Sequence, residues 1–463
     1  MAGCRWRRVC ICLGSLCISL VLLFIYIAFT VCSNINSTGI KGTQGTQKSI
    51  HFVASGSYKT TNYASLPTTF WKENEEAFWN QLQLKLDRHF NPILDAQNAR
   101  QVIHEKDFYD SILTRSFLEV TASDSMKRKF EQLPEQMQDF VSHMKQRDYP
   151  IILQPPSGTC GAGEPDEKMA PLVLLAIKSS EKNFENRQAI RQTWGKAGWV
   201  ATHRRNSTEK REVGGYIRRV FLIGKDKKMK RSNDEKLSML SMERGIYHDI
   251  LQWDFNDTFF NLTLKDVLFW KWFSNYCSNT RFVFKGDDDI FVNIPNMITY
   301  LQDQLLVQHS ERNMNDFMVG DVINAAFPNR LDESKYFVPE TFFTGLYPAY
   351  AGGGGVVYSG HLAKRLNQIS SSLHLFPIDD VFVGMCMARL NANPIHHPGF
   401  LTFDFPDKEE QEPCAYHTIF LVHKRSPKQI IELSANVTKT LKQCWNEPLR
   451  SSDKKKKGKR KKF

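Results

Sequence analysis

A chain of 463 residues is long enough for one large domain with accessory segments, or for two ordinary domains. Hydrophobic residues make up 41% and charged residues 24%, which excludes a disordered or fibrous protein and predicts a packed core. The formal charge of +12 is concentrated at the ends: residues 454–463 carry eight positive charges and residues 1–8 carry three. Because the body between them is nearly neutral, we expect no nucleic-acid partner.

Residues 9–31 form an apolar run without a charged side chain. At about 1.5 Å per residue, a helix of this length would span roughly 35 Å, enough to cross a bilayer. Three arginines precede it and the first charge after it is Lys41, so the positive-inside rule predicts a cytosolic tail at 1–8 and a lumenal body. A cleaved signal peptide is the alternative, although its apolar core is normally about 7–15 residues.

The lumenal side carries further signs of the secretory pathway. Sequons of the form N-x-S/T begin at Asn36, Asn206, Asn256, Asn261 and Asn436. Beyond the anchor the cysteines are dispersed and show no zinc-ligand spacing, so structural disulfides are expected with one cysteine left over. These cysteines are Cys160, Cys277, Cys386, Cys414 and Cys444.

Composition divides the rest of the chain. Residues 32–69 are rich in Ser, Thr, Gly and Asn and read as a stem. Residues 70–165 show an interrupted helical pattern, which predicts a lead-in region packed on a main domain at 166–445. Residues 446–463 read as a basic disordered tail, with binding to acidic glycans or partners as the alternative.

Within the main domain, short apolar runs alternate with helical patterns. Strands are expected at 172–178, 217–223, 281–285 and 317–322, and helices at 186–194, 262–276 and 295–306. This alternation predicts an α/β fold with a parallel-rich sheet. Ligands of such sheets bind beyond the carboxyl ends of the strands.

Asp287, Asp288 and Asp289 follow a predicted buried strand and therefore fall at that edge. Three adjacent carboxylates repel one another unless a positive charge lies beside them. A divalent cation bound to diphosphate oxygens would offset the repulsion and stabilise a leaving nucleotide. An acidic surface turn or helix cap is the alternative.

Two further segments suit a binding site. Four glycines, Gly352 to Gly355, remove every side chain from one stretch and allow close approach of a sugar or phosphate, unless the stretch is simply a flexible loop. Asp379 and Asp380 precede an apolar helical pattern. One aspartate is explained as a helix cap, whereas a second could deprotonate an acceptor hydroxyl.

Three basic residues remain open to two interpretations. Arg187 and Arg191 lie four apart on one predicted helix face, where they would pair either with a diphosphate or with carboxylates. His423 follows an apolar run and is either a structural residue or a ligand of a metal or phosphate.

Taken in order, RQAIRQTWG, FKGDDDIFVN, YPAYAGGGG and PIDDVFVGMC resemble the β-1,3-glycosyltransferase family of inverting enzymes, over about residues 70–445. The resemblance implies a GT-A, Rossmann-like glycosyltransferase domain with a helical lead-in and a single transmembrane helix. It also implies a type II protein of the Golgi membrane.

The resemblance implies roles for individual residues. Asp289 would ligate Mn²⁺ or Mg²⁺ with help from His423, and Asp380 would be the catalytic base. The donor would be contacted by Asp287, Asp288, Lys178, Arg187, Arg191, Gly353 and Gly354. The acceptor would lie near Tyr336 and Asp379. The segment 323–334 matches the family only loosely, which leaves the acceptor contacts open.

The implied reaction transfers N-acetylglucosamine from UDP-GlcNAc to the 3-hydroxyl of a terminal galactose on an N-acetyllactosamine-type glycan of a glycoprotein or glycolipid. A single displacement would invert the anomeric carbon. Homo- or hetero-oligomers are left open. A β-1,3-galactosyltransferase using UDP-Gal is the alternative. A catalytically silent glycan-binding protein is disfavoured by the intact acidic motif, and a two-metal phosphohydrolase lacks further ligands at suitable spacing.

Overall fold

The computed structural model describes residues 77–90, 124–160, 170–202, 213–226, 233–307, 314–406 and 408–451. All of them fall within one compact unit, Ile50–Phe463. The expected cytosolic tail, anchor and stem, and the sequons at Asn36 and Asn206, lie outside the described residues. Among the helices of the described ranges, none has the length and apolar character needed to span a bilayer.

The elements alternate along the chain. The helices are α2 (Phe78–Phe90), α4 (Asp124–Glu131), α5 (Glu135–His143), α6 (Phe184–Gln192), α7 (Asn233–Tyr247), α8 (Leu262–Tyr276), α9 (Ile294–Val307), α11 (Gly360–Ser370), α12 (Asp379–Arg389) and α13 (Pro427–Thr440). The strands are β1 (Ile151–Leu153), β2 (Val173–Lys178), β3 (Gly198–Thr202), β4 (Val213–Lys225), β5 (Ile250–Asn256), β6 (Phe282–Asp287), β7 (Phe291–Val292), β8 (Met318–Gly320), β9 (Val322–Ile323), β10 (Tyr350–Ala351), β11 (Gly355–Ser359), β12 (Ile395–His396), β13 (Phe400–Leu401) and β14 (Leu421–Val422). Two short 3₁₀ helices, η2 (Glu409–Gln411) and η3 (Ala415–His417), precede β14.

One large mixed sheet organises the unit. Its strands run in the order β1-β5-β4-β2-β6-β11-β8-β12, and β3 pairs with β4 beside this path. The central strands β5, β4, β2 and β6 are parallel, whereas β1, β3 and β11 are antiparallel to their neighbours. The expected parallel-rich α/β sheet is therefore confirmed at the centre, and antiparallel strands extend it at both sides.

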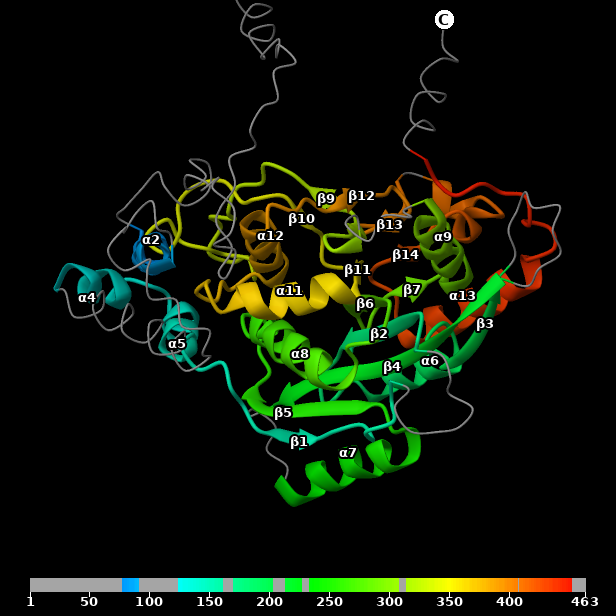
Figure 1. Cartoon of the computed structure of the whole chain (residues 1–463), viewed down its shortest axis with the longest axis horizontal. Helices are drawn as coiled ribbons and strands as arrows, with labels where there is room; N and C mark the ends of the chain where they lie inside the picture. The colour runs from blue at the N-terminus through cyan, green and yellow to red at the C-terminus, as the bar shows by residue number, and fades with distance from the viewer. Residues whose placement is uncertain are drawn as a thin grey trace, which may run out of the picture. The chain divides into compact units, whose positions relative to one another are not determined.

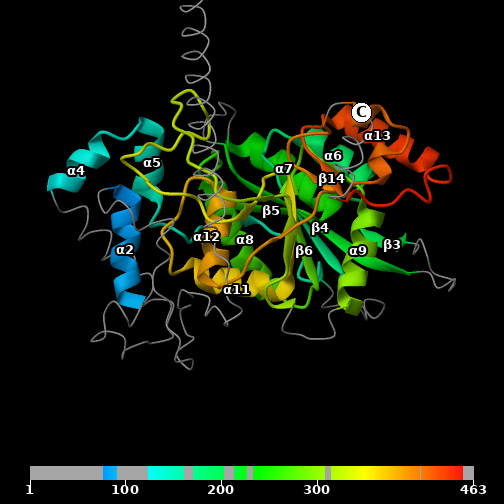
Figure 2. The same ribbon diagram turned by 90° about the horizontal axis from the view of Figure 1, so that it is seen from above.

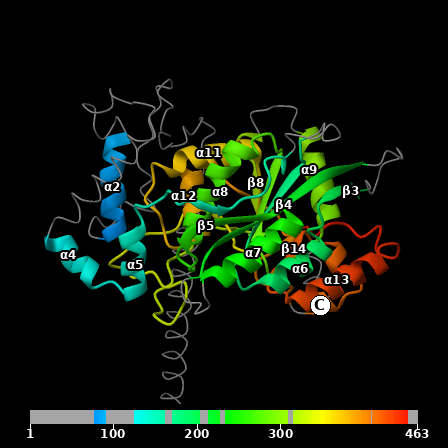
Figure 3. The ribbon, with the colours of Figure 1, turned by 90° about the horizontal axis from the view of Figure 1, so that it is seen from below.

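Alternating side chains of the central strands serve two apolar cores. On β2, Leu174 and Ala176 face a core shared with α8, α11 and α12, while Leu175 and Ile177 face a core shared with α6, α9 and α13. Figures 2 and 3 show the same division, with α8, α11 and α12 on one side of the sheet and α9 and α13 on the other. Helices on both faces explain why the strands read as continuous apolar runs.

Most elements of the main domain lie where the sequence places them. The helix expected at 262–276 coincides with α8, and the strands expected at 172–178, 217–223 and 281–285 correspond to β2, β4 and β6. The strand expected at 317–322 is instead divided into β8 and β9. The chain bends at Asp321, whose carbonyl accepts a hydrogen bond from Gly352 N at 2.7 Å, and β9 then pairs with β10 in a separate sheet.

The lead-in region contributes to the main fold. β1 pairs with β5 and so forms one edge of the large sheet. Trp79 of α2 is fully buried against Phe343 and Phe376, and its indole nitrogen donates to Leu375 O at 3.0 Å. In Figure 1, α2, α4 and α5 gather on the side of the sheet where α12 lies.

Two disulfides confirm the expectation for the dispersed cysteines. Cys160 pairs with Cys277 and Cys414 pairs with Cys444, which leaves Cys386 free and buried. At the start of the segment expected to be a basic tail, Arg450 N donates to Thr418 O at 2.7 Å, and the boundary at residue 446 stays a prediction. Residues 452–463 lie outside the described part of the chain.

Candidate active site

Three neighbouring strands bring the predicted site segments together. Lys178 ends β2 and Asp287 ends β6, and the two residues are partners in the parallel ladder. On the other side of β6, Gly286 is paired with Gly355, the first residue of β11. The acidic triplet and the glycine run, far apart in sequence, therefore meet at one edge of the sheet.

Asp287, Asp289 and His423 form the one cluster among the described residues that has the composition of a metal site, with ligand atoms all within 4.8 Å of one another. His423 Nε2 lies 3.2 Å from Asp289 and 3.6 Å from Asp287. The other ring nitrogen, Nδ1, lies 3.2 Å from Thr402 O, and a carbonyl can only accept a hydrogen bond. Nδ1 therefore carries the proton, which leaves the Nε2 lone pair facing the carboxylates in the neutral ring.

The electrostatics of this cluster favour a bound cation. Burial alone would lower the pKa of His423, but the hydrogen bond and charge of Asp289, with the charge of Asp287, raise it. Burial and the charge of Asp379 raise the pKa of Asp287 despite the opposing charge of Lys178. The two carboxylates thus draw positive charge toward the same point.

Lys178 joins two of the predicted site segments. Its ammonium lies 2.6 Å from Asp379 Oδ2 and 3.3 Å from Asp287 Oδ1, and the side chain is 5% exposed. Burial would lower the pKa of Lys178, but the charges of Asp287 and Asp379 raise it well above its usual value. In turn Lys178 lowers the pKa of Asp379 against the effect of burial. Lys178 was expected on the donor side and Asp379 on the acceptor side. The two side chains form an ion pair with each other.

Asp380 occupies the first turn of α12, next to the glycine run. A Cβ added at Gly353 would lie 2.8 Å from Asp380 Oδ2, so only glycine allows this approach. A Cβ at Gly354 would lie 3.3 Å from Cβ of His423. Burial and the adjacent charge of Asp379 raise the pKa of Asp380 to about 8. A carboxylate with a raised pKa is suited to accept a proton near neutrality.

Asp288 is oriented differently from its neighbours. Its carboxylate accepts hydrogen bonds from Ser179 Oγ at 2.6 Å and from Asn183 Nδ2 at 2.9 Å, and the residue is 7% exposed. Burial raises the pKa of Asp288 to about 6, although these hydrogen bonds oppose the shift. The side chain of Asp288 is therefore bound by the loop after β2 and takes no part in the cluster of Asp287, Asp289 and His423.

Arg187 and Arg191, expected to contact the donor, are each paired with a buried carboxylate, and their contact with the donor stays a prediction. Arg187 Nε and Nη2 each lie 2.7 Å from the carboxylate of Glu243. Arg191 donates to both oxygens of Asp249 at 2.7 and 2.9 Å. Both arginines are buried, and an arginine taken out of water requires such partners. The carboxylate alternative drawn from the sequence is the one the structure shows.

Tyr336 is half-exposed, and its expected place near the acceptor stays a prediction. Its ring meets Phe259 edge-on at 5.2 Å, and the ammonium of Lys335 lies 4.9 Å from the centre of its ring. Burial, together with the charges of Asp380 and Tyr336, raises the pKa of Tyr350 to about 12. Tyr350 is thus a neutral phenol near Asp380.

Three of the predicted sequons lie in the described chain. Asn261 precedes α8 and its side chain donates to Asn256 O at 2.8 Å, which ties these two sequons together. Asn436 is exposed on α13. All three remain predictions for glycan attachment.

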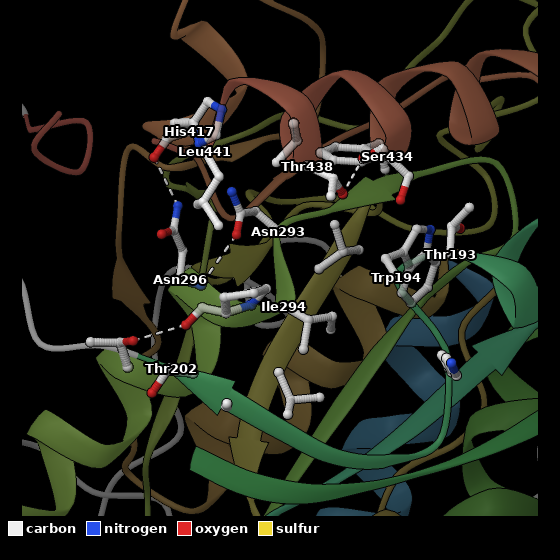
Figure 4. A pocket seen from close by; sticks show the side chains of 18 of the residues that line it. Thr193, Trp194, Thr202, Asn293, Ile294, Asn296, His417, Ser434, Thr438 and Leu441 are labelled. Carbon is white, nitrogen blue, oxygen red and sulfur yellow. Dashed lines mark hydrogen bonds between the residues drawn. The ribbon is translucent and has the colours of Figure 1, made fainter. Parts of the chain in front are cut away.

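A large hollow of the described residues lies elsewhere. It has a volume of about 1510 Å³ and is bounded by β3, α9 and α13, with Trp194, Asn293, Asn296 and Thr438 among its lining side chains (Figure 4). Its polar groups are already engaged, since Asn296 Nδ2 donates to His417 O and Asn293 Nδ2 donates to Tyr416 O. None of the aspartates discussed above lines this hollow. The candidate active site is therefore identified by its carboxylates and histidine, and not by the volume of a cavity.

Sequence reasoning missed Ser179 and Asn183, which hold Asp288, and Tyr350 beside Asp380. Ser179 was open to prediction, because it follows the buried strand that ends at Lys178. Glu243 and Asp249 could not be predicted as the partners of the two arginines, because nothing in the sequence near them indicates a contact with α6.

Comparison with known proteins places the chain among sugar transferases. Residues 185–398 match the family model described as galactosyltransferase. The chain is 40% identical over 373 residues to human N-acetyllactosaminide β-1,3-N-acetylglucosaminyltransferase 2, covering 79% of this chain and 85% of the relative. It is also 40% identical over 312 residues to human UDP-GlcNAc:βGal β-1,3-N-acetylglucosaminyltransferase 9, covering 63% and 72%. A solved bifunctional glycosyltransferase, WbbM, matches with a TM-score of 0.31 and 13% identity over 62% of this chain and 53% of that one, and no argument rests on it.

Proposed function

This chain belongs to the galactosyltransferase family and is a glycosyltransferase, and from that premise we propose that it transfers N-acetylglucosamine from UDP-GlcNAc to terminal galactose in β-1,3 linkage. The names of the relatives support the donor and the linkage. The single observation that carries the proposal is the meeting of Asp287, Asp289 and His423 with Asp380 at one edge of the sheet. A GT-A-type fold accords with the parallel strands at the centre of that sheet.

A divalent cation fits the cluster of Asp287, Asp289 and His423. Carboxylate oxygens and an imidazole nitrogen are donors that Mn²⁺ accepts, and Mg²⁺ favours the oxygens. When bound, the ion would neutralise the diphosphate as UDP departs. The proposal also gives Asp287 a ligand role, which the sequence did not assign to it, because its Oδ2 lies 3.6 Å from His423 Nε2 within the same cluster.

Asp380 is proposed as the base of the transfer. Its carboxylate takes the proton from the 3-hydroxyl of galactose, and the oxygen then forms a bond to the anomeric carbon of the donor sugar. The bond between that carbon and UDP breaks on the opposite face, so an α-linked donor gives a β-linked product. Lys178 keeps Asp379 ionised beside the base, and this negative charge favours the proton on Asp380.

The remaining site residues are proposed to bind the two substrates. Asp288, Gly353 and Gly354 are proposed on the donor side, where the two glycines allow Asp380 and His423 to lie directly against the backbone. Tyr336 and Asp379 are proposed on the acceptor side, with Asp379 acting while it is paired to Lys178. The acceptor is proposed to be an N-acetyllactosamine-type glycan of a glycoprotein or glycolipid.

The cellular setting is likewise a proposal. The apolar run at 9–31 and the arginines before it support a type II protein of the Golgi membrane with a lumenal body. Protease protection of the body in sealed Golgi vesicles would test this orientation, and digestion without detergent would contradict it.

The donor is tested by turnover. With Mn²⁺ present, a lactosamine acceptor should be extended faster from UDP-GlcNAc than from UDP-Gal, after correction for hydrolysis. Asp380→Asn should lower kcat by about 10²- to 10⁴-fold, because the base is lost while the shape of the side chain is kept. Faster transfer from UDP-Gal would replace the proposal with a β-1,3-galactosyltransferase. Unchanged turnover in Asp380→Asn would show that the base is another group.

The pH dependence gives an independent check on Asp380. A base must be ionised to act, and the pKa of this carboxyl is raised to about 8. The value of kcat/KM should therefore fall about tenfold per pH unit below the pKa and level off above it. We expect Asp380→Asn to remove this acidic limb from its residual activity. A wild-type profile that is flat between pH 6 and 9 would contradict the assignment.

A further inference from the structure

The carboxylate of Asp288 is held by hydrogen bonds from the loop that follows β2. Ser179 Oγ lies 2.6 Å and Asn183 Nδ2 lies 2.9 Å from the same oxygen, Oδ2. Asn186 Nδ2 donates to the backbone carbonyl of Asp288 at 3.1 Å. These contacts turn Asp288 away from His423, although Asp287 and Asp289 on either side of it face that histidine.

The direction of the hydrogen bond from Ser179 is fixed by a buried arginine. Arg187 Nη1 lies 3.1 Å from Ser179 Oγ, and a guanidinium group can only donate. The serine oxygen therefore accepts from Arg187, and its single hydrogen is left for Asp288. Arg187 is held in this position, because it is 1% exposed and its Nε and Nη2 both donate to the carboxylate of Glu243.

The backbone of Ser179 is fixed as firmly as its hydroxyl. Lys265 Nζ donates to Ser179 O at 2.8 Å and also lies 2.9 Å from Asp257 Oδ2. Ser179 N donates to Leu222 O at 3.0 Å. Lys265 is 1% exposed, so the backbone of Ser179 is anchored from the protein interior.

We propose that Ser179, with its polarity set by Arg187, is a positioning residue that presents Asp288 to the nucleotide of the donor. The inference rests on the proposed function, in which Asp288 contacts the donor. Charge-assisted hydrogen bonds of this length orient a carboxylate more strongly than neutral ones. Without the serine hydroxyl, the carboxylate of Asp288 keeps only the hydrogen bonds from Asn183. We then expect the carboxylate to adopt more than one orientation.

Adjacent serines provide a matched test. Ser179→Ala removes the hydroxyl that binds Asp288, whereas Ser180→Ala removes a buried hydroxyl with no hydrogen-bond partner among the described residues. With Mn²⁺ present, calorimetry should show about tenfold weaker UDP binding for Ser179→Ala, in line with the loss of one hydrogen bond to a charged group. Ser180→Ala should bind UDP as the wild type does. In turnover, Ser179→Ala should raise KM for the nucleotide sugar and leave kcat within about threefold.

A double substitution tests whether Ser179 acts through Asp288. If it does, Ser179→Ala added to Asp288→Asn should weaken UDP binding no further than Asp288→Asn alone. If the double variant instead lost UDP affinity by the product of the two single-variant factors, the proposal would be overturned. Equal UDP affinities of the Ser179→Ala and Ser180→Ala variants would overturn it too. A lowered melting temperature with unchanged UDP affinity would show a merely structural serine. UDP binding is measured without sugar transfer, so a wild type that binds UDP but does not use UDP-GlcNAc would refute the proposed function and leave this inference standing.

Discussion

At the scale of single residues, Asp287, Asp288 and Asp289 differ in their neighbours although they are adjacent in the chain. The strand β6 ends at Asp287, and the turn that follows sends alternate side chains in different directions. Asp287 and Asp289 face His423, and Asp288 faces Ser179. The sequence predicted a metal site here, but the partners of each carboxylate depend on segments more than a hundred residues away.

Gly353 is the residue whose role is most open to a direct test. An added Cβ would lie 2.8 Å from the carboxylate oxygen of Asp380. Gly353→Ala should lower kcat about tenfold to a hundredfold, because a displacement of the base by about 1 Å is costly to catalysis. Steady-state kinetics would measure the loss, and circular dichroism would verify that the fold is kept.

Gly245 of α7 provides the control for this substitution. A Cβ added there meets nothing within 4 Å. Gly245→Ala should keep full activity and raise stability by roughly 0.5–1 kcal/mol, as expected for alanine in a helix. Activity of Gly353→Ala equal to that of Gly245→Ala would mean that Asp380 adjusts freely.

At the scale of elements, the predictability of a helix or strand follows its periodicity. Elements such as α8 and β2 are found from sequence because their apolar patterns are continuous and both pack inside one domain. The short strands β9 and β10 escape prediction, since two residues carry no periodic pattern and their pairing is set by tertiary contacts. Likewise the position of α2 could not be read from its sequence, although its helical character could.

The contact of α2 with the main domain is tested by Trp79. This side chain is fully buried between two phenylalanines of distant loops. Trp79→Ala should lower the free energy of unfolding by about 3–5 kcal/mol, because it leaves a large cavity and an unpaired carbonyl at Leu375. Denaturant titration of the lumenal fragment would measure this loss.

Trp199 is a suitable comparison, since it is 47% exposed on β3. Its replacement by alanine should cost less than about 1.5 kcal/mol, because the site is already in contact with water. Equal losses for Trp79→Ala and Trp199→Ala would indicate that α2 does not stay docked in solution.

At the scale of the whole molecule, two disulfides close loops of different length. Cys160 and Cys277 are 117 residues apart, and Cys414 and Cys444 are 30 apart. Disulfides could be expected from the sequence, but their pairing could not, because any two of the five dispersed cysteines are compatible with the spacing. The pairing follows from the end of α8, where Cys277 meets the segment that leads in from β1.

Loop length predicts how much each disulfide contributes. In the chain-entropy model the longer loop is worth about 5 kcal/mol and the shorter roughly 3.5 kcal/mol. The double variant Cys160→Ser, Cys277→Ser should therefore be less stable than Cys414→Ser, Cys444→Ser in equilibrium unfolding. The reverse order would indicate that contacts in the unfolded chain, and not loop closure, decide the contribution.

The pairing of β1 with β5 has a practical consequence for truncation. A recombinant fragment that starts at residue 166, where the sequence places the domain boundary, would retain every aspartate of the site. It would lack β1, so the backbone of β5 would be an exposed edge, open to pairing with another copy. It would also lack Cys160, and Cys277 would be left as a free thiol. A stable catalytic fragment should therefore be longer than the catalytic motifs suggest and reach back to include β1 and Cys160.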